Sequence, residues 1–134
     1  MMLESNTDVP ASGNGAAVGR CCSAIRAMLS RVGDKWSVLV VTMLSDAPLR
    51  FNELRRRIDG ISQRMLTRTL RELERDGLVT RTVTPTTPPS VEYALTDLGH
   101  TLLEPVRSLI LWTQANYPAI STAQQRFDAT QKPL

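Results

Sequence analysis

Apolar residues recur at every third or fourth position along much of the chain, a pattern that predicts amphipathic helices. A first helix is predicted over about residues 20–32, and Gly33 is expected to stop it. A second helix is predicted over 35–46, because Asp34 can serve as its N-cap. The nearly continuous apolar character of this second segment indicates that it is buried on most sides.

Two further helices, joined by a short turn, are predicted in the middle of the chain. The first is short and amphipathic and covers about residues 50–58. Gly60 supplies a turn, Ser62 is the expected N-cap of the next helix, and Gly77 is expected to end it. Leucines and arginines lie on opposite faces of this later helix. The apolar face carries Leu66, Leu70 and Leu73, and the basic face carries Arg64, Arg68, Arg71 and Arg75.

The remaining third begins with two segments rich in β-forming residues, 78–84 and 91–96, which are predicted strands. Three prolines in the connection make it a stiff, extended loop rather than a tight hairpin. A last helix is predicted over about 97–117, with Pro105 expected to kink or divide it. Residues 119–134 are polar and are expected to form a tail with at most a short helix.

This order of elements predicts a mainly α (α+β) fold of the winged helix-turn-helix type. Two helices joined by a tight turn and followed by a two-stranded β-wing define that fold, which places the second helix of the pair in the major groove of DNA. The leading residues, 1–19, are small and polar with glycine and proline, and we expect them to be disordered.

Positive charge is concentrated in the middle of the chain. Residues 50–81 contain nine arginines and five acidic residues, a local net charge of +4, whereas the whole protein carries +3. The rest of the chain therefore has a net charge of −1. This segment contains no lysine, and arginine is the residue best suited to bidentate contacts with phosphate and guanine. The distribution favours a polyanionic partner.

Other classes of protein are disfavoured by what the sequence contains. The adjacent Cys21 and Cys22 and the single His100 cannot supply a four-ligand zinc site, and no nucleophile–base or nucleotide-binding motif is present. We therefore expect no enzymatic activity, no metal and no cofactor. No apolar run is long enough for a membrane span, and no secretory signal precedes the domain, so a cytoplasmic protein without a membrane partner is expected.

Three segments resemble the HxlR-type family of bacterial transcriptional regulators. They are "CCSAIRAMLSRVGDKW", "LRFNELRRRIDGISQRMLTRTLRELERDGLVTR" and "PPSVEYALTDLGHTLLEPV", with Trp112 following them. The resemblance runs from about Cys22 to Tyr117 and places the winged helix-turn-helix domain at 20–118. It implies a homodimer that binds operator DNA through the winged helix, with N- and C-terminal helices paired across a two-fold axis. On this similarity the candidate dimer residues are Ile25, Met28, Leu29, Leu109, Ile110 and Trp112. The alternative is that these residues pack only within one subunit.

Candidate DNA contacts follow from the helix-turn-helix geometry. The N-terminal part of the second helix enters the groove, and the wing suits backbone or minor-groove contacts. The candidates are Ser62, Gln63, Arg64, Thr67, Arg68 and Arg71 on the helix, and Arg81, Thr84, Thr86 and Thr87 on or near the wing. Arg81 shares strand parity with Val79 and Val83 and is expected to lie partly against the core. Two alternatives remain: a solvated helix face, since Glu72 and Glu74 also point outward, or a protein-interaction module that binds an acidic partner.

Cys22 is a candidate redox-sensing residue, with Cys21 beside it. It lies fourteen residues before Trp36, where the resemblance implies a cysteine that is the reactive thiol in some members. A position near a helix N-terminus, with Arg20 and Arg26 close by, would favour the thiolate. The alternative is a small buried apolar residue, because free cysteines are often buried. An effector is not identified by the sequence.

Overall fold

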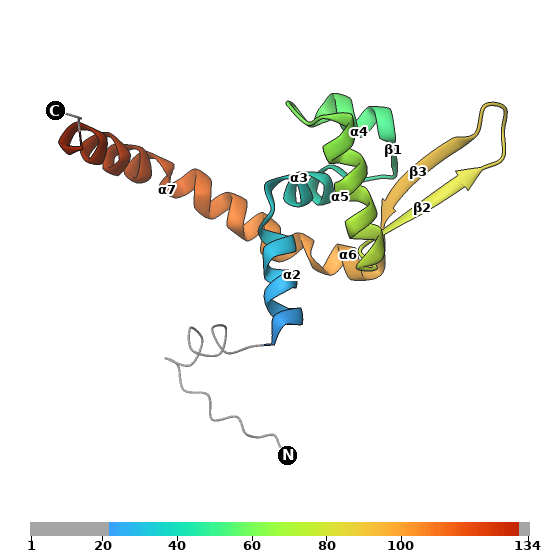
Figure 1. The fold of residues 1–134 in the computed structure, drawn as a ribbon, viewed down its shortest axis with the longest axis horizontal. Helices are drawn as coiled ribbons and strands as arrows, with labels where there is room; N and C mark the ends of the chain where they lie inside the picture. The colour runs from blue at the N-terminus through green and yellow to red at the C-terminus, as the bar shows by residue number, and fades with distance from the viewer. Residues whose placement is uncertain (1–21, 132–134) are drawn as a thin grey trace, which may run out of the picture.

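The fold was analysed in a computed structural model that describes residues 22–131 (Figure 1). The predicted N-terminal lead, 1–19, lies outside the described residues, as does Cys21. The elements follow in the order α2 (Ser23–Gly33), α3 (Lys35–Met43), β1 (Leu49–Arg50), α4 (Phe51–Arg57), α5 (Gln63–Arg75), β2 (Val79–Thr84), β3 (Ser90–Leu95), α6 (Asp97–Thr101) and α7 (Leu103–Thr130). The prediction of a mainly helical winged helix-turn-helix is confirmed.

The sheet has three antiparallel strands in the order β1-β3-β2. Strands β2 and β3 form the predicted wing, with Val79 opposite Leu95 and Thr84 opposite Ser90. The expectation of only two strands is incomplete, because β1 pairs with β3 and places Leu49 opposite Tyr93. Two residues are too few to show the alternating pattern of a strand, so β1 is visible only through its tertiary pairing.

The hydrophobic core lies between α3, α4, α5 and the base of the sheet. Side chains from all of these elements are almost completely buried, among them Val40, Leu54, Leu66, Leu70 and Val79. The predicted apolar face of α5 is confirmed, since Leu73 is buried as well. Thr69 on the same helix is 2% exposed, a buried polar residue that the leucine pattern does not reveal.

The predicted caps are formed. The side chain of Asp34 accepts a hydrogen bond from the Ser37 backbone N–H at 3.0 Å, which satisfies one free donor of α3. Ser62 does the same for α5, accepting from the Met65 backbone N–H at 3.0 Å. At the other end of α5, Gly77 adopts φ +78°, in the left-handed region that favours glycine.

The predicted end of the first helix at Gly33 is confirmed, since α2 ends at that residue. Other predicted helix boundaries are wrong. The helix α3 ends at Met43 and does not reach residue 46. The long C-terminal segment divides at Leu102 and not at Pro105. Pro105 lies in the first turn of α7, where the backbone N–H of a residue has no partner within the helix and proline is tolerated.

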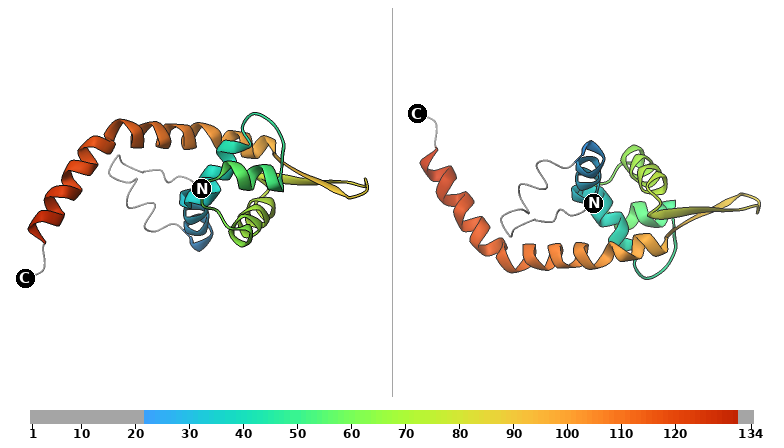
Figure 2. Two further views of the ribbon diagram at one scale, coloured as in Figure 1. Left: turned by 90° about the horizontal axis from the view of Figure 1, so that it is seen from above. Right: turned by 90° about the horizontal axis from the view of Figure 1, so that it is seen from below.

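The helix α7 also continues beyond the expected end near Tyr117, through Pro118 to Thr130. The polar segment is therefore helical as far as Thr130, and Figure 2 shows that α7 is bent along its length. Proline inside a helix removes one hydrogen bond and forces such a bend. The wing and α7 project in opposite directions from the helical core (Figure 1). Across residues 22–131, no helix combines the length and the apolar character needed to cross a membrane.

Candidate nucleic-acid interface

The outer face of α5 is an exposed, basic surface. The leucines of α5 face the core, so the opposite side of the helix points to solvent. Five of the predicted DNA contacts lie there and line one open groove of about 680 Å³ together with Glu72. We call this surface the α5 face, and it comprises Gln63, Arg64, Thr67, Arg68 and Arg71. The structure therefore brings these five residues together, as the helical spacing predicted.

Two other residues of this region have different positions. Ser62 is exposed, but its Oγ is the cap acceptor at the start of α5. Its oxygen is therefore already engaged, although its O–H can still donate. Arg75 is exposed in the last turn, beyond the residues that line the groove. These positions agree with a groove that runs from Gln63 to Glu72 and stops before the last turn of the helix.

Glu72 is the acidic member of the groove. Its Oε2 lies 3.5 Å from Nε of Arg68, one turn earlier on α5. Its Oε1 lies 3.8 Å from Nε of Arg31, which belongs to α2. The side chain of Arg68 is 69% exposed despite this pair, so its guanidinium remains accessible from solvent.

The wing carries the remaining predicted contacts. Arg81, Thr84, Thr86 and Thr87 are all exposed. The expectation that Arg81 lies partly against the core is wrong: Arg81 is exposed, although its cross-strand neighbour Tyr93 packs against the core. At the wing tip Thr86 Oγ1 donates to the Pro88 carbonyl at 2.8 Å, which shapes the connection between the strands.

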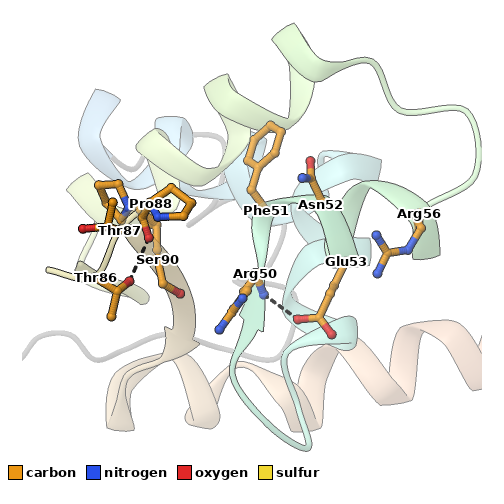
Figure 3. Close-up of a pocket in the computed structure, with 11 residues that line it drawn as sticks. Arg50, Phe51, Asn52, Glu53, Arg56, Thr86, Thr87, Pro88 and Ser90 are labelled. Carbon is orange, nitrogen blue, oxygen red and sulfur yellow. Dashed lines mark hydrogen bonds between the residues drawn. The ribbon is translucent and has the colours of Figure 1, made fainter. Parts of the chain in front are cut away.

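A second groove, of about 980 Å³, separates the wing tip from the start of α4. Figure 3 shows Arg50 and Arg56 on one side of it and Thr86, Thr87 and Ser90 on the other. The Arg50 backbone N–H donates to Oε1 of Glu53 at 2.9 Å, which fixes the start of α4. The proximity of Arg50 to the wing is not evident from the sequence, because it depends on the pairing of β1 with β3.

The predicted DNA contacts thus form two surfaces. One is the α5 face, and the other is the wing with its groove against α4. No residue lines both grooves.

The candidate thiol, Cys22, is exposed and free. The alternative of a buried cysteine is therefore wrong. Cys22 is the N-cap of α2, and the backbone N–H groups of Ile25 and Ala24 lower the pKa of its thiol. These are donors that stabilise the negatively charged thiolate.

The candidate dimer residues form exposed apolar positions on two helices. On α2 they are Ile25, Met28 and Leu29, and on α7 they are Leu109 and Trp112, all of them exposed. Ile110 is only partly buried. Packing within one subunit therefore does not cover the five exposed side chains. Further exposed apolar residues of α7 that the sequence analysis did not select are Leu111, Tyr117 and Phe127.

Within the described residues, no group of three or more His, Cys, Asp or Glu side chains is arranged to hold a metal ion.

The fold is a winged helix, and α5, the second helix of the helix-turn-helix pair, exposes an arginine-rich face. These two features are typical of helix-turn-helix regulators. A family model described as HxlR-like helix-turn-helix matches residues 31–121, and the chain belongs to this family. It is a transcriptional regulator and not an enzyme.

Similar proteins are named as regulators. An HTH-type transcriptional regulator of Methanothermobacter thermautotrophicus is 48% identical over 91 residues, which cover 68% of this chain and 69% of the relative. The transcriptional regulator YtfH of Salmonella typhimurium has a similar structure, with a TM-score of 0.70 and 38% identity over 75% of this chain and 89% of that one. The reduced form of the redox regulator HypR gives a TM-score of 0.69 and 41% identity, covering 75% of this chain and 99% of HypR.

Proposed function

We propose that the protein is a homodimeric regulator that binds double-stranded operator DNA in a sequence-specific manner. The observation that carries this proposal is the α5 face: five exposed polar and basic side chains on the helix that follows the turn, with its apolar side held in the core. A rigid helix with such a face has the shape and charge of a major-groove reader.

The roles of the side chains follow from their positions along α5. Gln63, Arg64 and Thr67 lie in its first half, the end that enters the groove, and are assigned to base edges. Arg68 and Arg71 lie one turn later and are assigned to phosphates. Such contacts release counterions, so binding should weaken steeply as salt increases.

The wing is assigned to the flanking backbone or minor groove. Arg81, Thr84, Thr86 and Thr87 supply a guanidinium and hydroxyl groups on that surface. Arg50 faces the wing tip across the second groove and is added to this set. Contacts of this kind fix the orientation of a protein on DNA without specifying sequence.

Dimerisation is assigned to the exposed apolar side chains of α2 and α7. Trp112 is 57% exposed and Ile25 is 52% exposed in the single chain, and large exposed apolar side chains favour an interface. A two-fold dimer would present two α5 faces to a pseudo-palindromic site, about one helical turn apart.

Redox regulation is assigned to Cys22. Its exposure and its lowered pKa are the two properties that make a thiol reactive. HypR, whose fold is similar, is described as a redox regulator and has been solved in reduced and oxidised forms. Cys21 is the second candidate thiol, and it lies outside the described residues.

Fluorescence anisotropy of the reduced protein tests the proposal directly. The probes are DNA from upstream of its own gene and a scrambled fragment of equal length, each in a salt series. Preference for the native fragment, with affinity that falls steeply in salt, is the expected result. Equal binding to both fragments would place the operator elsewhere. If neither fragment binds at low salt, the DNA-binding proposal is wrong and an acidic protein becomes the partner to test.

A further inference from the structure

Helix α2 is connected to the DNA-facing helix α5 through one charged side chain, Arg31. No residue of α2 is buried, and its backbone packs mainly on α3. Most of its apolar side chains point to solvent. Arg31 is different, because its side chain is only 20% exposed and reaches across to the C-terminal end of α5.

The guanidinium of Arg31 is held there by two contacts. Nη1 forms an ion pair with the carboxylate of Asp76, whose side chain is 8% exposed. The same nitrogen donates to the Glu72 carbonyl oxygen at 3.1 Å. A cation is favourable at this end of a helix, where carbonyl groups lack partners within the helix. Arg31 is therefore fixed in position and does not itself line the α5 face.

Glu72 lies between Arg31 and Arg68. Its two carboxylate oxygens face different arginines, with 3.8 Å from Oε1 to Nε of Arg31 and 3.5 Å from Oε2 to Nε of Arg68. The three side chains form an Arg31–Glu72–Arg68 network that begins on α2 and ends on the α5 face. Arg68 is its solvent-exposed end.

We infer that Arg31 is a positioning residue for DNA binding, which acts by neutralising Glu72 and so leaving Arg68 available to a phosphate. A carboxylate with a single cationic partner holds that partner more firmly than a carboxylate that is shared. If Arg31 is absent, Glu72 keeps its charge beside the DNA-facing surface and pairs with Arg68 alone. Arg68 must then leave that pair before it can contact a phosphate, and affinity falls.

This inference rests on the proposed DNA-binding function and deepens it. The helix that carries Arg31 also carries Cys22 and three of the candidate dimer residues. The network therefore gives α2 a direct electrostatic connection to the α5 face. A movement of α2 would carry Arg31 toward or away from Glu72. It would therefore change how far the Glu72 carboxylate is neutralised beside the α5 face.

A double-mutant cycle tests the inference, with DNA affinity measured by anisotropy on the fragment that the wild type prefers. Arg31→Met retains much of the aliphatic packing and removes the charge. We expect it to weaken binding by about threefold to fivefold, the scale of one partly exposed ion pair. Glu72→Gln should bind at least as well as wild type. The double variant should bind like Glu72→Gln, because Arg31 influences Arg68 only through the Glu72 carboxylate. The pair with Asp76 is lost in both Arg31 variants, and thermal unfolding measures what that loss costs the fold.

Arg126→Met is the matched control, since it removes one exposed arginine near the C-terminal end of α7. That end of the helix lies far from α5 (Figure 2). Its affinity should equal that of the wild type. Circular dichroism and thermal unfolding show whether each variant is folded at the temperature of the assay. Unchanged affinity of Arg31→Met overturns the inference. So does an equal loss in the presence and absence of Glu72, which would mean that Arg31 acts through the fold or on DNA directly.

A second measurement does not depend on DNA. The Nε–Hε resonance of Arg68 in a ¹⁵N-labelled protein reports its pairing with Glu72. It should shift in Arg31→Met, move toward the position of a solvated arginine in Glu72→Gln, and remain there in the double variant. If the wild type binds no DNA but these shifts appear, the network stands and the proposed function fails. If the resonance does not respond to Arg31→Met, the network does not operate, whatever the DNA result.

Discussion

Gly99 of α6 lies directly against the backbone of Leu78, so that a Cβ atom added to Gly99 would collide with the Leu78 carbonyl oxygen. The same oxygen accepts a hydrogen bond from the Thr96 backbone N–H at 3.1 Å. The carbonyl therefore cannot move aside without breaking this hydrogen bond, which joins Thr96, just after β3, to Leu78, just before β2. This contact fixes where α6 leaves the sheet and hence where α7 begins.

Gly99→Ala should destabilise the fold by about 3 kcal/mol, at the upper end of the range for overpacking a rigid site. Chemical denaturation followed by circular dichroism measures the change in the free energy of unfolding. Gly33→Ala is the control, because a Cβ atom there meets nothing within 4 Å and its φ is not positive. We expect that change to stay within about 0.5 kcal/mol. Similar effects of the two substitutions would show that the contact at Leu78 is not tight.

Arg64→Ala tests the α5 face. It should weaken binding to the preferred DNA by about tenfold and weaken binding to scrambled DNA by less, because a base contact carries sequence information and a phosphate contact does not. Arg75→Ala removes the same charge from the same helix but outside the groove, and its effect should be small on both fragments. Both are measured by anisotropy at one salt concentration. Equal losses for the two variants would assign the effect to general electrostatic attraction.

Leu109→Glu tests the proposed interface on α7. In a two-fold dimer the substitution places an unpaired carboxylate at two positions of the same interface. The dimer dissociation constant should rise by at least about a hundredfold, since each buried charge costs several kcal/mol. Sedimentation velocity over a concentration series measures it. Leu98→Glu is the control, because Leu98 is 56% exposed on α6, outside the candidate interface. If Leu109→Glu remains as dimeric as Leu98→Glu, the interface lies elsewhere.

The α5 face was predictable because its cause is local. Leucines and arginines at helical spacing determine which side of α5 is buried, and Ser62 and Gly77 determine where it starts and ends. These features require no knowledge of the rest of the chain. The candidate dimer residues on α2 and α7 came instead from the family resemblance, and the sequence alone left open whether they pack within one subunit.

The features that could not be predicted depend on contacts between distant residues. Arg31 contacts Glu72 and Asp76 at separations of 41 and 45 residues, and no periodicity in the sequence indicates such a pair. The strand β1 contains two residues and is defined only by β3. The continuation of α7 through Pro118 was missed because proline normally favours a helix end.

Cys22 supplies the last prediction, which concerns pH. The backbone N–H groups of Ile25 and Ala24 stabilise the thiolate, so they lower the pKa of the Cys22 thiol below that of an ordinary cysteine. Between the lowered and the ordinary pKa, Cys22 therefore has a larger thiolate fraction than a cysteine in an unfolded peptide. Alkylation should accordingly be faster in this window, and the two rates should converge above the ordinary pKa.

The rate of iodoacetamide labelling from pH 6 to pH 10, measured by mass spectrometry in a Cys21→Ser background, gives the pKa of Cys22. A peptide of residues 18–30 with the same substitution is the reference, because it has the same neighbours without the folded N-cap. A profile shifted to lower pH in the protein supports the proposed thiol chemistry. The companion experiment treats wild type and Cys22→Ser with diamide before the DNA assay. Loss of DNA affinity in the wild type alone would make Cys22 the redox-sensitive residue, whereas an equal response in both would exclude it.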